Sequence, residues 1–134
     1  MLINLKMLSN RDKDILEALW NSPTPLTASE IVQSNSELRM TTVQTVLRKL
    51  LNNNIVEVAD IVHSGTVLSR RYKPVVSADE YAASQFYELG KKISKANLIL
   101  HLLNAETDPE KVSEEIGQLE AMLDEYKIRL KSQE

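Results

Sequence analysis

Residues 40–51 constrain the fold more than any other segment of this 134-residue chain. Their apolar side chains recur at the three- and four-residue spacing that marks one face of a helix. These residues are Val43, Val46, Leu47, Leu50 and Leu51. The opposite face is polar and basic, and it carries no carboxylate, although acidic residues outnumber basic ones in the whole chain. The segment therefore predicts a helix that packs one face on a core and leaves the other free.

The free face of this helix has the chemistry of a nucleic-acid contact. Hydroxyl, amide and guanidinium groups bond base edges and phosphates, whereas a carboxylate facing a phosphate is repelled. An ordinary solvated helix surface is the alternative, and the neighbouring segments decide between the two. The face comprises Thr41, Thr42, Gln44, Thr45, Arg48, Lys49 and Asn52, with Gln44 at its border.

Two shorter helical patterns precede this segment. Each of the three predicted helices begins with a hydroxyl residue followed three positions later by an acid or amide, which is the capping-box pattern. The pairs are Ser9 with Asp12, Thr27 with Glu30, and Thr41 with Gln44. The first helix has an apolar stripe and ends before two prolines, Pro23 and Pro25. Three capped helices with a short connection between the last two predict a helix-turn-helix.

A β-hairpin is predicted directly after the third helix. Residues 55–62 are rich in β-branched side chains, residues 63–66 form a turn, and residues 67–73 return as a second strand that Pro74 ends. A hairpin following a helix-turn-helix is the wing of a winged helix. Arg70, Arg71 and Lys73 make the second strand basic. They are either solubilising charges on an edge strand or contacts along a phosphate backbone.

Composition excludes several classes of protein. The chain contains no cysteine, which rules out disulfides, thiol catalysis and zinc fingers, and its three glycines form no phosphate-binding loop. His63 and His101 lie far apart in the sequence without an accompanying acidic pattern, so we expect no catalytic or metal site and no cofactor. No apolar run is long enough to cross a bilayer. We expect a cytoplasmic protein that is not an enzyme.

Charge divides the chain into two parts. Residues 1–76 hold nine Lys/Arg and seven Asp/Glu, a net charge of +2, whereas residues 77–134 hold seven and twelve, a net charge of −5. This division predicts a DNA-binding domain at 1–76 and a second domain at 77–134 that does not contact DNA.

The second domain is predicted to be helical and to form a dimer. A helix capped by Ser77 runs to a bend at Gly90, an apolar stretch covers 93–103, and Asp108 with Pro109 opens a last helix. Apolar residues on that helix recur in a heptad-like seam. The dimer candidates are Ile99, Leu102, Leu103, Val112, Ile116, Leu119, Leu123, Tyr126 and Leu130. The alternative is that the seam packs against the head of the same chain; we favour a two-fold dimer.

These segments together resemble the penicillinase-repressor family, which includes the methicillin-resistance repressors. The resemblance rests on six segments, of which the Thr-Val-x-Thr run within 41–50 and the tryptophan that closes the first helix are the most characteristic. They are Ser9, the apolar residues Ile15, Leu16, Leu19 and Trp20, and the stretches 26–32, 41–50, 72–77 and 80–81. The resemblance implies a bacterial, dimeric winged-helix repressor whose recognition helix enters the major groove of a palindromic operator. By position it nominates Thr41, Thr42, Gln44, Thr45 and Lys49 as contacts to bases, whereas helix geometry alone nominates Arg48.

The chain departs from the family pattern in three places. Asn54 replaces the usual glycine before the first wing strand, and the wing, from about Val58 to Tyr72, is longer than usual. Antibiotic-resistance repressors carry a protease-sensitive asparagine–phenylalanine bond in the tail, where this chain has His101 and Leu102. A sensor protease stays a candidate partner, but we expect one of the family type to cut poorly. The cysteine motif of the copper-responsive branch is absent.

The sequence thus predicts a mainly α protein with a small β-hairpin, composed of a winged helix-turn-helix head and a C-terminal helical dimerisation tail. Its partners would be double-stranded operator DNA and a second copy of itself, with no membrane. The phosphate candidates are Thr27, Arg70, Arg71 and Lys73. The alternative function is a winged-helix protein-interaction module without sequence-specific DNA binding. The carboxylate-free face of the third helix favours the repressor.

Overall fold

The computed structural model describes residues 8–133. The chain forms two compact units that divide between Glu88 and Leu89. Residues 1–7 of the predicted head and Glu134 of the predicted tail lie outside the described range. We describe each unit separately.

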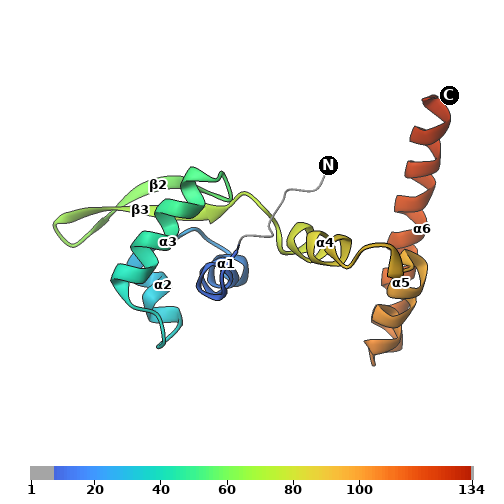
Figure 1. Cartoon of the computed structure of the whole chain (residues 1–134), viewed down its shortest axis with the longest axis horizontal. Coiled ribbons are helices and arrows are strands. Elements are labelled where there is room, and N and C mark those ends of the chain that lie inside the picture. The colour runs from blue at the N-terminus through green and yellow to red at the C-terminus, as the bar shows by residue number, and fades with distance from the viewer. Residues whose placement is uncertain (1–7, 134) are drawn as a thin grey trace. The chain divides into compact units, whose positions relative to one another are not determined.

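Three helices form the framework of the first unit, as the sequence predicts (Figure 1). They are α1 (Asn10–Asn21), α2 (Ala28–Ser34) and α3 (Met40–Asn52). Complete capping boxes open α1 and α2, with Ser9 and Thr27 as the N-cap residues. The apolar faces of the helices meet in one core, and its fully or nearly buried residues are Ile15, Leu16, Leu19, Ile31, Leu38, Val43, Val46, Leu47, Leu50, Ile55, Val56 and Val76.

The predicted capping box at the start of α3 is wrong. A helix capped by Thr41 would begin at Thr42, but α3 begins two residues earlier, at Met40, and Arg39 at its N-cap makes no side-chain capping hydrogen bond. Thr41 therefore lies inside the first turn, where its hydroxyl cannot cap. The other end follows the prediction, because Asn54 adopts a left-handed conformation with φ of 57° just after the helix. Asparagine tolerates this conformation better than most residues.

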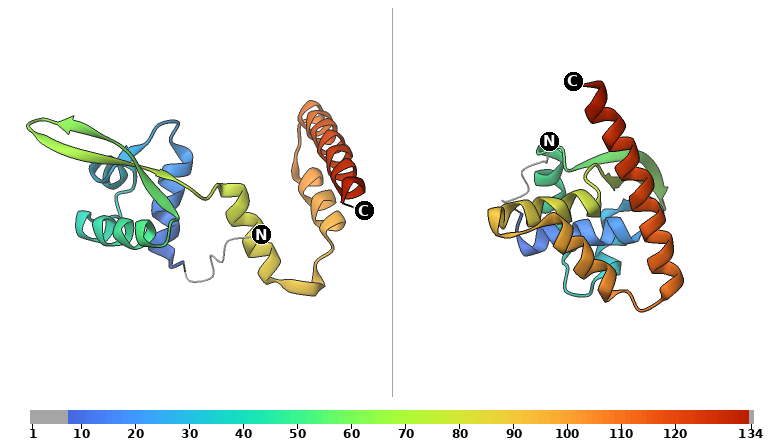
Figure 2. Two further views of the ribbon diagram at one scale, coloured as in Figure 1. Left: turned by 90° about the horizontal axis from the view of Figure 1, so that it is seen from above. Right: turned by 90° about the vertical axis from the view of Figure 1, so that its right-hand side faces the viewer.

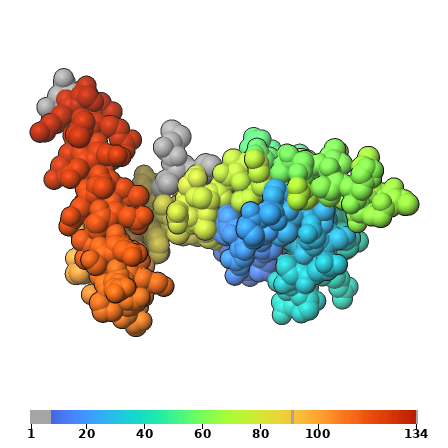
Figure 3. Space-filling model, turned by 180° about the vertical axis from the view of Figure 1, so that it is seen from behind, coloured from blue at the N-terminus to red at the C-terminus, as the bar shows by residue number. Residues whose placement is uncertain are grey.

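The sheet of the head has three antiparallel strands in the order β1-β3-β2. The long strands β2 (Val56–Ser64) and β3 (Val67–Pro74) form the predicted hairpin, which projects from the helices (Figures 1–3). Its loop is shorter than predicted, because β2 continues to Ser64 and Gly65 takes a left-handed φ of 67°. The sequence missed β1 (Leu26–Thr27), since a two-residue strand carries no periodicity. Helix-turn-helix and hairpin together form a winged helix.

The next helix belongs to the head by its contacts. In α4 (Ala78–Glu88), the Tyr81 ring lies 5.5 Å from the Trp20 ring, centre to centre. The Trp20 Nε1 donates a 2.8 Å hydrogen bond to the Val76 carbonyl, which ties α1 to the segment that leads into α4. Ser77 caps α4 as predicted, with reciprocal bonds to Glu80. The compact head thus extends beyond residue 76, where the charge pattern placed its end.

The second unit consists of a short 3₁₀ turn and two helices. The turn, η1 (Gly90–Lys92), contains Gly90 at φ 76°, which is the bend that the sequence predicts. It leads to α5 (Lys95–Ala105) and to the 24-residue helix α6 (Pro109–Ser132), capped by Asp108. None of the residues in α5 or α6 is buried, so the apolar side chains of this unit remain accessible in a single chain.

Candidate nucleic-acid interface

The outer face of α3 is exposed as the sequence predicts. Val43, Val46, Leu47 and Leu50 are buried below it, whereas Thr41, Gln44, Thr45 and Arg48 face solvent and Thr42 is half-buried. No carboxylate interrupts this surface, and no described residue forms an ion pair with Arg48. The face therefore combines free hydrogen-bonding groups with a free positive charge.

The Thr45 hydroxyl group uses its hydrogen-bond donor within α3 but keeps its acceptor free. Its Oγ1 donates a 2.9 Å hydrogen bond to the Thr41 carbonyl one turn earlier. The oxygen lone pairs and the methyl group remain available. Thr45 can thus accept a hydrogen bond from a base amino group or contact a thymine methyl without any change in its own bonding.

Lys49 is engaged inside the protein. Its Nζ lies 2.5 Å from Oδ2 of Asp12, which is only 1% exposed at the start of α1. The same carboxyl oxygen accepts a 2.9 Å bond from the backbone N–H of Ser9 in the capping box. This contact joins residues 37 positions apart, so no local pattern could have revealed it. It ties the recognition helix to α1.

The ionised form of Asp12 is favoured despite burial. Burial alone would raise the pKa of this carboxyl, since a charge is poorly solvated in the protein interior. Hydrogen bonds from Lys49 and Ser9, with the positive charge of Lys49, outweigh that effect and lower the pKa below its ordinary value of 3.8. Asp12 is therefore charged at neutral pH, and Lys49 is its counter-ion.

Two of the three basic residues on the wing are also paired. Arg71 donates two hydrogen bonds to Asp60 on the neighbouring strand, one of them 2.7 Å long from its Nε. These bonds from Arg71 lower the pKa of the exposed Asp60 carboxyl. The Nζ of Lys73 lies 3.1 Å from Glu57. Most of the positive charge predicted for the wing is therefore balanced by the opposite strand.

Arg70 differs from its two basic neighbours. Side chains alternate between the faces of a strand, so Arg70 lies on the opposite face of β3 from Arg71 and Lys73. It pairs in register with Ile61 rather than with an acid, and no described residue forms an ion pair with it. Arg70 is thus the basic side chain on the wing that is free to meet an anion.

Two residues outside the face of α3 bear on the predicted contacts to DNA. Thr27 is only 8% exposed, and its hydroxyl accepts the Glu30 N–H as the N-cap of α2, so its side chain has a structural role. Arg39, which the sequence pattern did not indicate, is exposed immediately before α3 and has no ion-pair partner among residues 8–133. The sequence feature that could have identified Arg39 is its position as a basic residue directly before a helix whose outer face has no carboxylate.

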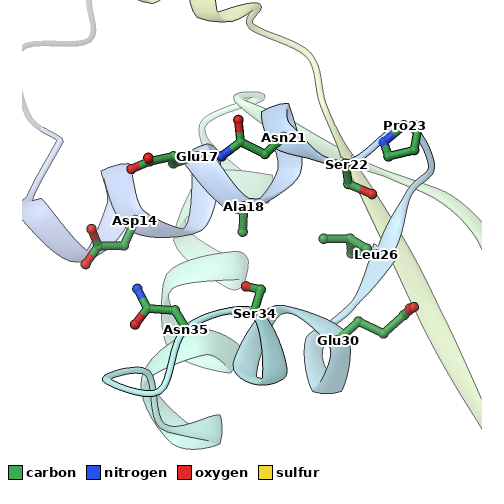
Figure 4. A pocket seen from close by; sticks show the side chains of 10 residues that line it. All are labelled: Asp14, Glu17, Ala18, Asn21, Ser22, Pro23, Leu26, Glu30, Ser34 and Asn35. Atoms are coloured by element: carbon green, nitrogen blue, oxygen red, sulfur yellow. The ribbon is translucent and has the colours of Figure 1, made fainter.

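A hollow of about 530 Å³ lies between α1 and α2, with α3 passing behind it (Figure 4). Its lining includes three carboxylates, Asp14, Glu17 and Glu30. This negative surface would repel phosphate. In the described part of the chain, no group of three or more histidine, aspartate or glutamate side chains is arranged to hold a metal ion.

The fold and the exposed face of α3 define a winged-helix protein of the DNA-binding class. The penicillinase repressor model matches residues 8–125, and the chain belongs to this family. It is therefore a DNA-binding transcriptional repressor, from a family of transcriptional regulators. None of the described helices is both long and apolar enough to span a lipid bilayer.

Comparison with other proteins adds only distant likenesses. No curated protein sequence matches the chain. Similar solved structures include a MarR-family transcription regulator, with 16% identity over 90% of this chain and 76% of that one, at a TM-score of 0.45. Another is the Hop2–Mnd1 complex of Giardia lamblia, with 17% identity, 90% and 80% coverage and a TM-score of 0.36. Neither is close enough to bear on function.

Proposed function

We propose that this protein is a dimeric, sequence-specific repressor that binds a palindromic operator with α3 in the major groove and the wing beside it. The observation that carries the proposal is the exposed, carboxylate-free face of α3 in a member of the penicillinase repressor family. The contacts to bases would come from Thr41, Thr42, Gln44, Thr45 and Arg48. Lys49 enters this set only if it exchanges its bond to Asp12 for one to DNA.

Dimerisation is part of this proposal because a single head has no net positive charge. The compact head, residues 1–88, holds nine Lys/Arg and ten Asp/Glu, a net charge of −1, and phosphate contacts supply most non-specific affinity. A dimer makes the second head's binding effectively intramolecular. The proposed dimer surface is the apolar side of the second unit, where Ile99 is 40% and Leu102 57% exposed. A two-fold dimer would recognise half-sites about one helical turn apart, or a multiple of it.

Thr45→Ala is expected to relax base preference at one position of the operator. The loss of a base-edge contact costs about 1–3 kcal/mol on the correct site and little on other sequences. An operator would be selected from a random pool of DNA duplexes, and binding measured by fluorescence anisotropy over a salt series. Equal loss of affinity on selected and random DNA would contradict the assignment of Thr45. Salt-independent binding by the wild type would favour the protein-interaction module instead.

Arg70→Ala is expected to weaken binding to all DNA sequences about tenfold and to reduce the salt slope by about one unit. The matched control is Asp60→Ala with Arg71→Ala, which removes the other wing arginine together with its partner and leaves the net charge unchanged. We expect that pair of changes to alter affinity less than Arg70→Ala does. If the double change lowered affinity more than Arg70→Ala did in the same anisotropy titration, the phosphate contact would be assigned to Arg71 instead.

A sensor protease is the remaining candidate partner. We propose that cleavage by a protease of the family type is not what releases this protein from DNA. The His101–Leu102 bond would lie inside α5, so a protease would have to unwind that helix before it could bind an extended substrate. The pair also lacks the residues found at the scissile bond of the antibiotic-resistance repressors. An inducing signal would instead act through the tail.

A further inference from the structure

We propose that the α6 helices of two chains pair antiparallel, centred near residue 121, so that the C-terminal half of each covers the N-terminal half of the other. This inference rests on the proposed dimerisation and specifies how the two tails meet. Three observations support it: the symmetry of the seam, the uneven cover that α5 gives to α6, and the charges beside the seam.

The seam of α6 maps onto itself when one copy is reversed. Its residues are spaced 4, 3, 4, 3 and 4 apart, in the order Val112, Ile116, Leu119, Leu123, Tyr126 and Leu130. In an antiparallel pair centred at residue 121, Val112 meets Leu130, Ile116 meets Tyr126, and Leu119 meets Leu123 of the other chain. Every apolar seam residue would therefore have an apolar partner, including the residues at the two ends of the seam.

Helix α5 does not extend along the C-terminal half of α6. It has 11 residues against 24 in α6, and α6 runs on past it (Figures 1 and 2). In the first half Val112 and Leu119 are half-buried and Ile116 is 40% exposed, whereas in the second half Leu123 is 58%, Tyr126 54% and Leu130 50% exposed. The half that lacks cover in its own chain would be placed on the half that carries α5 in the other chain.

Charges beside the seam distinguish the two orientations. In heptad terms, Glu115 and Arg129 occupy g positions and Glu120 an e position. An antiparallel pair brings g near g, and so Glu115 near Arg129 of the other chain, twice in a two-fold dimer. A parallel pair brings g near the following e, which sets Glu115 against Glu120. Arg129 already lies beside the seam, 5.3 Å from the centre of the Tyr126 ring.

Antiparallel pairing has one unfavourable contact and one further favourable term. Glu120 would face its own copy near the two-fold axis, and this like-charge contact costs a little in an exposed setting. The positive N-terminal end of each helix would lie near the negative C-terminal end of the other, which the helix dipoles favour. Two Glu115–Arg129 pairs outnumber the single Glu120 contact.

Glu115→Lys tests the orientation, since its effect has opposite signs in the two arrangements. Antiparallel pairing predicts that the change sets two lysines against two arginines and raises the dimer dissociation constant about tenfold. Adding Arg129→Glu reverses both charges and should restore the wild-type value. The control is Glu114→Lys, the same change one residue away on the outer side of α6, which should have little effect. Sedimentation equilibrium on the full chain measures all four proteins.

Cross-linking between introduced cysteines gives a second measurement. The chain has no native cysteine, so only the introduced residues can react. A Ser113→Cys chain is mixed with a Lys127→Cys chain, and a short bis-maleimide reagent is added. Antiparallel pairing brings residues 113 and 127 of different chains together, and the mixed product should dominate. Parallel pairing separates them by about 21 Å along the helix, and only products between like chains would form.

The outcomes separate this inference from the proposed function. A wild-type protein that sediments as a monomer would overturn the proposed dimer itself. A dimer that Glu115→Lys strengthens or leaves unchanged, with cross-links between like chains, would overturn the antiparallel arrangement and leave the dimeric repressor standing. Weakening by Glu115→Lys, rescue by Arg129→Glu and a mixed cross-link together establish it.

Discussion

Replacing Leu119 and Leu123 together with aspartate should make the protein monomeric and lower its apparent affinity for operator DNA by at least about 100-fold. Both side chains lie in the middle of the α6 seam, with Leu119 half-buried and Leu123 58% exposed in one chain. Burying two carboxylates without partners in a dimer contact costs more than the contact gains. Loss of the dimer removes the effectively intramolecular binding of the second head.

The control for this prediction is Ala121→Asp with Ile128→Asp, which adds the same two charges on the outer side of α6. Neither variant should alter the head, because every buried apolar residue of the described core lies between Ile15 and Val76. Circular dichroism checks the fold, sedimentation the oligomeric state and anisotropy the binding. A seam variant that stays dimeric, or a monomer that binds as tightly as the wild type, would refute the role of the tail.

Lys49→Met should lower the free energy of unfolding by about 2 kcal/mol. The change leaves Asp12, which is 1% exposed, without its counter-ion, while the partial exposure of Lys49 limits the loss. The matched change Arg48→Met, one residue away, should affect stability little because Arg48 has no ion-pair partner among the described residues. Arg48→Met should instead weaken DNA binding. Urea unfolding and anisotropy titration distinguish the two effects.

The loss caused by Lys49→Met should also depend on pH. The pKa of Asp12 is lowered below 3.8, so the ionised carboxyl stabilises the fold above that pH and the contribution disappears as the pH falls through the lowered pKa. The wild type and the variant should therefore differ most near neutral pH and converge in acid. A difference that stays constant down to pH 3 would show that Lys49 stabilises the fold by packing alone.

Local patterns in the sequence were sufficient for most elements of this protein. The apolar spacing of α3 predicted which of its side chains are buried, because a helix on a core repeats every three or four residues. Ser9, Thr27, Ser77 and Asp108 marked helix starts since each forms its capping bonds within the first turn. The same reasoning failed at Thr41, where the preceding residue already begins the helix.

The tertiary structure alone determined which charged groups are free to act. The sequence nominated Lys49 for base contact and Arg70 and Arg71 for phosphate contact, and it treated all three side chains as available to DNA. Folding brings Asp12 to Lys49 across 37 positions, and the register of β2 with β3 brings Asp60 to Arg71 while leaving Arg70 without an acid. Such pairings depend on which elements pack together, and neither composition nor periodicity contains that information. The residues exposed on α3 were predictable locally, whereas the availability of their charges followed from the fold.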